Sequence, residues 1–304
     1  MRELFRIVFF LPYDHFDIAA GVSHALDTYV RAVEDRPTAL SEYICCWGEA
    51  FKLSEQGWER IRDILSPKER TFFDDYPRHQ ARLAEKEGAS PYFAIHGERE
   101  SGYCFDYRAR IPFRETPPNF VSVLSATLPT EYLEERGPGF AHKLVLDMAS
   151  RLPFASGHAG LSLDIAYVSI EHLAVLRPLM TRHPGFDLRH ASIRDFMGSQ
   201  VDGVHWINFL GQPVLGRLGG AAGLRTRLQS PTTLVHELEG ERAVVTLGPQ
   251  PEAGDLFLGQ TLPEYRELAR VLEPWLEPFD SDFLLCTRQA DEAELRRWWR
   301  RFLD

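Results

Sequence analysis

Strand-like and helix-like segments follow one another in an irregular order along this chain, and that order limits its fold more than any other feature. Two pairs of β-like runs, 92–97 with 102–108 and 232–238 with 242–248, are each separated by a few polar residues, which predicts two β-hairpins. Hairpins join antiparallel strands, whereas a doubly wound parallel sheet needs a helix between successive strands. The sequence therefore predicts an α+β fold with mixed or antiparallel sheets, several hairpins and helices packed on the sheets.

Other segments carry the same two kinds of pattern. Apolar side chains recur at helical spacing in three stretches within 22–33, 141–152 and 265–272, which predicts amphipathic helices. We expect Pro178 to kink or end a further helix that contains Leu176. Further strands are expected at 4–11, 43–53, 119–128, 159–168, 203–210 and 283–288.

The length of 304 residues fits one large domain or two packed halves. The stretch 181–202 contains Gly, Pro and His residues and is typical of a long connection. We therefore predict an N-terminal α+β half at 1–180, a connection at 181–202 and a C-terminal α+β half at 203–304. One compact unit is the alternative.

The charge balance limits the partners. The chain has 44 acidic and 34 basic side chains, a formal net charge of −10. Phosphate backbones and anionic membrane surfaces both require a basic surface, so we expect neither nucleic acid nor a membrane as partner. Opposite charges accelerate association, and the acidic balance suits a protein partner with a basic surface. Plain solubility is the other explanation of this charge.

The sequence also bears on location. The apolar run 4–11 contains Arg6 and is cut off by Pro12, unlike the uninterrupted core of a secretory signal. The four cysteines show neither zinc-type spacing nor a dense disulfide pattern; they are Cys45, Cys46, Cys104 and Cys286. We expect a protein of the cytoplasm with reduced thiols and no membrane span.

The chain contains fragments of two chemical motifs, and each lacks a residue that its chemistry requires. Gly211 and Gly216 have the spacing of a phosphate-binding loop, but no Lys-Ser/Thr pair follows. His236 and Glu237 begin a zinc-protease motif, but Gly240 stands where the second histidine is needed. The sequence therefore predicts no catalytic, cofactor-binding or metal-binding residue, and no cofactor.

The histidines leave one alternative open. Six of them are spread over several elements without an i,i+4 pair, and they could still converge in space; they are His142, His158, His172, His183, His190 and His205. The alternative function is accordingly a hydrolase that uses clustered histidines. A structural or adaptor protein is a third possibility.

Two segments resemble a known family. The stretch 203–211, which continues to Gly219 and Gly220, is similar to an aromatic strand end followed by a Leu/Gly-Gly turn in immunity proteins of the type VI secretion system. The small-residue segment 156–162 resembles one that those proteins carry after a central helix. The resemblance implies a cytoplasmic protein that neutralises a cognate toxin, plausibly a nuclease, by forming a tight complex. That family has no shared catalytic motif, and the adaptor alternative would then belong to the secretion machinery.

A nuclease holds phosphates in a basic groove, so an acidic surface is the natural contact for it. Acidic side chains at turns and element ends are the candidate partner-binding residues; they are Glu98, Glu100, Glu131, Glu134, Glu135, Glu237, Glu239 and Glu241. By contrast, we expect Trp206 and the Gly219-Gly220 turn to serve the structure.

Overall fold

The computed structural model describes residues 2–45, 49–66, 92–98, 101–110, 119–163, 170–188, 196–279 and 291–304. The strand expected at 283–288 and the candidate contact residue Glu100 lie outside these ranges. None of the helices in the described ranges is long and apolar enough to cross a lipid bilayer.

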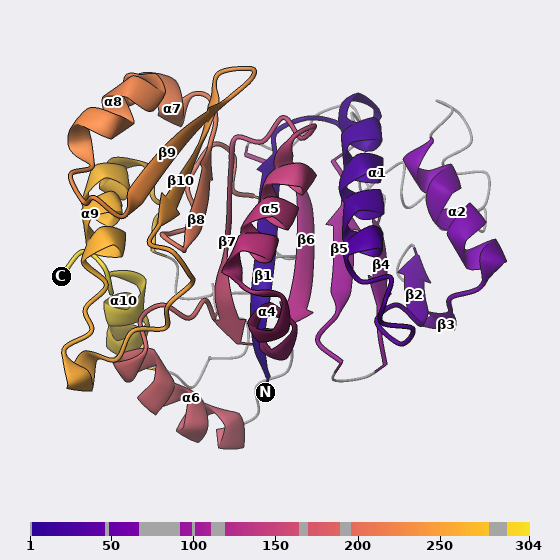
Figure 1. The fold of residues 1–304 in the computed structure, drawn as a ribbon, viewed down its shortest axis with the longest axis horizontal. Helices are drawn as coiled ribbons and strands as arrows, with labels where there is room; N and C mark the ends of the chain where they lie inside the picture. The colour runs from indigo at the N-terminus through magenta and orange to yellow at the C-terminus, as the bar shows by residue number, and fades with distance from the viewer. Residues whose placement is uncertain are drawn as a thin grey trace.

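Ten strands of the described residues form one sheet in which all neighbouring strands are antiparallel (Figure 1). The order across the sheet is β3 (Phe51–Lys52), β2 (Glu42–Cys45), β4 (Tyr92–His96), β5 (Cys104–Arg108), β6 (Ser122–Pro129), β1 (Glu3–Leu11), β7 (Ser156–Leu163), β8 (Ile207–Leu210), β10 (Arg242–Leu247) and β9 (Thr233–Leu238). The α+β prediction and both hairpins, β4–β5 and β9–β10, are confirmed. Because β7 pairs with β8, the two predicted halves share this sheet; their folding as separate units stays a prediction.

Two details differ from the sequence expectation. The single strand expected at 43–53 is wrong, because β2 and β3 pair antiparallel and the chain therefore reverses between them. The sequence predicts that Pro178 kinks or ends its helix; α6 (Ile170–Arg182) continues to Arg182, so the end is excluded and the kink stays a prediction. Ala174, whose carbonyl loses its partner at Pro178, is exposed to water.

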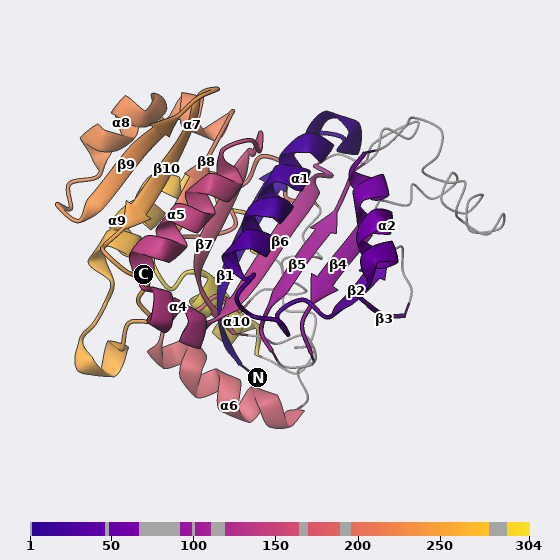
Figure 2. The same cartoon turned by 45° about the vertical axis from the view of Figure 1, so that its right-hand side comes forward.

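The apolar face of the sheet carries the main core. Phe5, Ile7, Phe9 and Leu11 alternate along β1 and are buried in this core, as the twofold side-chain period of a strand requires. Helices α1 (His15–Ala32) and α5 (Pro138–Ala149) lie side by side over this face (Figure 2). The predicted apolar stripe of α5, which includes Val145 and Met148, packs into the same core.

The opposite face is partly polar. Paired residues on antiparallel strands point to the same side, so one row across the sheet contains Asp106, Ser125, Val8, His158 and Asn208. Ser125, His158 and Asn208 are buried. Buried polar groups need partners, and His158 and Asn208 find theirs in the segment that precedes β8.

The remaining helices lie around the sheet. They are α2 (Glu55–Leu65), α4 (Thr130–Arg136), α7 (Val214–Arg217), α8 (Gly220–Arg227), α9 (Pro263–Leu272) and α10 (Glu292–Trp299). Two 3-10 turns lie at Leu256–Leu258 and Glu273–Trp275. Ser54 caps α2 by accepting a hydrogen bond from the Gly57 N–H, and Asp291 caps α10 by accepting one from Ala293.

Replacing Phe9 by alanine tests the central role of β1. Its ring contacts Phe209 with 4.9 Å between ring centroids and is buried, so the substitution leaves a cavity. We expect Phe9→Ala to lower the free energy of unfolding by about 3–5 kcal/mol in urea titrations. Phe257→Ala, at a side chain that is 76% exposed, should change it by less than about 0.5 kcal/mol. Equal losses in the two variants would contradict this description of the core.

Candidate functional site

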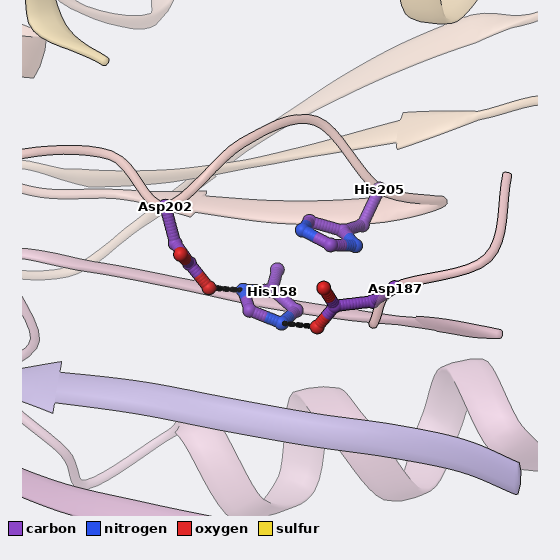
Figure 3. Close-up of side chains that lie close together, drawn as sticks. All are labelled: His158, Asp187, Asp202 and His205. Carbon is purple, nitrogen blue, oxygen red and sulfur yellow. Dashed lines mark ion pairs between the residues drawn. The ribbon is translucent and has the colours of Figure 1, made fainter. Parts of the chain in front are cut away.

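Two histidines and two aspartates meet on the polar face of the sheet (Figure 3). His158 comes from β7, Asp187 follows α6, and Asp202 and His205 precede β8. One ligand atom from each of the four lies within 4.8 Å of all the others. Their exposed fractions are 2%, 2%, 5% and 1% in the order His158, Asp187, Asp202, His205. We call these four residues the His–Asp cluster.

His158 lies between the two carboxylates. Its Nε2 is 3.5 Å from Asp187 Oδ2, and its Nδ1 is 3.5 Å from Asp202 Oδ2. Neither ring nitrogen makes a hydrogen bond with the described part of the chain. The rings of His158 and His205 stack, with centroids 3.7 Å apart and planes inclined by 13°. Arg6 on β1 adds a buried guanidinium whose Nη1 is 3.5 Å from Asp187 Oδ2.

Backbone contacts explain how the cluster assembles. β8 pairs with β7 only along Ser156 to Ala159. Beyond that point Asp187 takes the place beside β7: its N–H donates to the Leu161 carbonyl over 2.8 Å and its carbonyl accepts from Leu163 over 2.9 Å. The Asp187 side chain is thereby held against β1 and β7.

Asn208 and Gly160 place His205. The Asn208 side chain accepts from the His205 N–H over 2.9 Å and donates to the His205 carbonyl over 2.7 Å. Gly160 on β7 lies opposite, where a Cβ would come within 3.3 Å of His205 Cβ. A larger residue at Gly160 would push His205 out of the stack.

The donor types of the cluster have two chemical uses. Two imidazole nitrogens and two carboxylate oxygens can hold a divalent transition metal, or a proton on His158 can balance one of the carboxylates. A cavity of about 20 Å³ touches Asp202, which is room for about one water molecule. Because none of the four is more than 5% exposed, a substrate could not reach them in this structure.

Of the six histidines that the sequence analysis names, two lie together in the described structure and two lie apart from them. His158 and His205 converge, whereas His142 contacts Thr246 Oγ1 over 3.1 Å and His183 contacts the Gly254 carbonyl over 2.6 Å. His190 and the side chain of His172 lie outside the described residues. The absence of a metal site stays a prediction of the sequence.

The described acidic candidates are all exposed, and the structure distributes them over separate parts of the surface. Glu98 follows β4 at the turn of the first hairpin. Glu131, Glu134 and Glu135 lie on α4. The remaining three, at the β9–β10 turn, lie far from α4 in both views (Figures 1 and 2); they are Glu237, Glu239 and Glu241.

Local cations balance these clusters unequally. On α4, Glu131 pairs with Arg2 at 3.0 Å and Glu135 with Arg36 at 2.5 Å. At the second hairpin, Glu237 lies 4.0 Å from Arg225. The β9–β10 turn therefore presents its negative charge with less compensation than α4.

Trp206 and the glycine pair have the structural roles expected of them. Trp206 is 1% exposed, packs edge-on against Phe5 at 5.9 Å and donates a hydrogen bond to the Gly248 carbonyl. Gly219 and Gly220 have φ values of 85° and 71°, a region that glycine adopts readily. That neither feature contacts a partner stays a prediction.

A groove of about 480 Å³ between α1 and α5 has the opposite character from the acidic turns. Its charged lining consists of Arg31, Lys143, Arg151 and Asp147, with His24 beside them. A basic partner would be repelled from this groove.

Asp106 is a further carboxyl on the polar face. Burial raises its pKa to about 6, while a hydrogen bond from Tyr92 and the charge of Arg108 act in the opposite direction. Its Oδ1 is closed to solvent and makes no hydrogen bond within the described ranges. The ionised form is therefore destabilised in the folded protein.

Comparison with known proteins shows the family of this chain and a solved structure with a similar fold. The model of the TsiV family, described as type VI immunity for VRR-NUC, matches residues 22–302. A Pseudomonas aeruginosa T6SS protein of known structure superposes with a TM-score of 0.74 at 17% identity, over 99% of this chain and 84% of that chain. At this identity the likeness concerns the fold alone. A comparison with curated proteins finds no significant match.

Replacing Asp106 tests the burial of charge on the polar face. The pKa of Asp106 in the folded protein, about 6, lies above its ordinary value of 3.8, so the folded protein holds this proton more tightly than the unfolded chain. The folded state therefore loses stability relative to the unfolded state as the pH rises through about 6. At pH 8, Asp106→Asn should therefore be more stable than the parent by about 1–3 kcal/mol, and the gain should vanish near pH 4. Urea titrations across this range measure it, with exposed Asp63→Asn as control. A gain independent of pH would contradict the assignment.

Proposed function

The chain belongs to the TsiV family of type VI immunity proteins for VRR-NUC, and we propose that it neutralises a cognate nuclease toxin of that class by forming a protein–protein complex. The family match over residues 22–302 is the observation that carries this proposal. The proposed place of action is the cytoplasm, where the nucleic acid substrate of such a toxin lies.

The charge of the chain supports a basic partner surface. A nuclease groove must attract phosphates and is therefore basic. This chain has a formal net charge of −10, so long-range attraction would speed the encounter and help to orient it. The toxin surface in this proposal is the basic groove or its rim.

Among the acidic candidates, the β9–β10 turn is the best contact. Glu239 and Glu241 form no ion pair within the described part of the chain. Arg242 lies near Glu239, and the negative charge of Glu239 acts to raise the pKa of Arg242. The turn also connects β9, an edge strand of the sheet, to β10. Leu234 on the same edge strand is 63% exposed and would add an apolar contact farther from the turn.

The α1–α5 groove is a poor place for the same partner. Arg31, Lys143 and Arg151 line it, and like charges across an interface oppose binding. We therefore place the toxin away from this groove.

Protection in this proposal comes from binding and involves no catalysis. The His–Asp cluster is the convergence of histidines and carboxylates that a hydrolase would need, yet each of its residues is at least 95% buried. A catalytic site must admit substrate to its reacting groups. An adaptor of the secretion machinery would instead capture components of the apparatus and leave the toxin active.

Titration of toxin activity separates binding from catalysis. Purified cognate VRR-NUC toxin is assayed on DNA with increasing amounts of this protein. We expect activity to fall linearly and to end at about one immunity protein per toxin, as for tight stoichiometric binding. Loss of activity at a small fraction of one equivalent would indicate an enzyme, and no loss at excess protein would refute toxin binding.

Charge reversal at the β9–β10 turn tests the contact surface. We expect the triple variant Glu237→Lys, Glu239→Lys, Glu241→Lys to lower the association rate constant with the toxin at least about tenfold at low salt. Stopped-flow or surface-binding kinetics measure this change.

A matched control separates the local contact from net charge. Glu55→Lys, Glu59→Lys, Asp63→Lys reverses three exposed charges on α2 and alters the net charge by the same amount. We expect its association rate constant to stay within about threefold of the parent's. Equal slowing of both triple variants would place the contact elsewhere.

A further inference from the structure

We propose that the His–Asp cluster is a metal site, in which His158, His205, Asp187 and Asp202 hold one divalent transition-metal ion, with Zn²⁺ the best fit. The ion would tie the connection that precedes β8 to strand β7. This inference does not depend on the identity of the toxin.

The donor set and spacing favour this assignment. Zinc accepts imidazole nitrogen and carboxylate oxygen in tetrahedral sites, with bonds of about 2.0–2.2 Å. Ligand atoms on such a tetrahedron are about 3.4 Å apart. His158 Nε2 and Asp187 Oδ2 are 3.5 Å apart, and all four ligand atoms lie within 4.8 Å of one another. Ligand atoms at the largest of these separations would have to approach by about 1.4 Å to reach the tetrahedral spacing.

The surroundings of His158 match those of a metal ligand. A metal-bound imidazole usually donates its second N–H to a carboxylate or carbonyl, which fixes the ring. Nε2 of His158 faces Asp187 and Nδ1 faces Asp202. The carboxylate on the side of the nitrogen that takes the ion would join it as a ligand, and the other carboxylate would accept the second N–H and orient the ring. Because neither nitrogen is engaged in a hydrogen bond with the described chain, both are available for these roles.

A metal ion would compensate the negative charge buried in the His–Asp cluster. Two carboxylates lie in the interior, where ionised groups are costly unless compensated. Arg6 contributes one permanent positive charge next to Asp187. A divalent cation compensates the carboxylates without requiring a proton on His158. The ion would also join His158 on β7 to the residues of the cluster that precede β8.

The stacked rings of His158 and His205 would have to rearrange when the ion binds. Imidazole lone pairs lie in the ring plane, so two rings inclined by only 13° at 3.7 Å cannot both point to one ion. The His205 ring must turn out of the stack, while Asn208 holds its backbone through two hydrogen bonds. Since the four side chains are nearly inaccessible to solvent, the ion is expected to enter during folding.

Refolding of the full chain tests the site. The protein is unfolded in guanidinium with EDTA, the chelator is removed, and it is refolded with or without ZnCl₂ and passed through gel filtration. We expect about one Zn²⁺ per refolded chain by mass spectrometry of the metal. At a hundredfold excess over Kd, the Tm should rise on the order of 5 °C. Wild-type protein that holds no zinc, or whose Tm is unchanged, would overturn the proposal.

Two variants and a control localise the ion. His205→Gln and Asp202→Asn should lower the zinc content to less than about a tenth and remove the rise in Tm, because each loses a ligand or the carboxylate that orients one. His236→Gln, at an exposed histidine on β9, should keep both. Refolding with Co²⁺ should give the visible absorption bands of a four-coordinate site in the parent and not in His205→Gln. Equal zinc content, or an equal Co²⁺ spectrum, in the parent and His205→Gln would place the ion elsewhere and overturn the assignment.

Discussion

The register of β1 between β6 and β7 is the constraint on which the rest of the structure depends. Arg6 pairs with Thr127 on one side and Gly160 on the other. This register directs Phe5, Ile7 and Phe9 into the main core beneath α1 and α5 and leaves Arg6 on the opposite face beside Asp187. A shift by one residue would exchange the two faces, which would bury the guanidinium in the apolar core and remove it from the His–Asp cluster.

The polar face and the acidic surface are separate features with separate consequences. Inside, Asp187 continues the pairing of β7 where β8 ends, and Asn208 fixes the backbone of His205, so residues before β8 are attached to the sheet by polar contacts. Outside, the β9–β10 turn exposes carboxylates at the edge of the same sheet. Burial keeps the His–Asp cluster from substrates and partners alike, and the exposed edge is what an incoming basic protein would meet.

The sequence predicted those parts of the fold that depend on local periodicity. Two hairpins, the buried strand at 4–11 and the stripe of α5 follow from spacing alone and are confirmed. The reversal between β2 and β3 was missed because a short apolar run does not reveal where a turn divides it. The His–Asp cluster has no signature in the linear sequence, because one member lies on a strand and three on loops, and only pairing across the sheet brings them together. The segment 203–211, which resembles the family, includes His205, Trp206 and Asn208, and all three are buried. The resemblance in this segment therefore reflects packing and does not indicate which residues contact a partner.

Hydrogen–deuterium exchange of this protein, alone and with its cognate toxin, tests most directly whether it acts through its exposed surface. A bound protein slows exchange where it covers backbone amides. Slower exchange in β9 and the β9–β10 turn, with unchanged exchange in 156–163 around His158, is the result we expect. Slower exchange confined to 156–163 and the α1–α5 groove, with β9 unaffected, would contradict binding at the acidic edge.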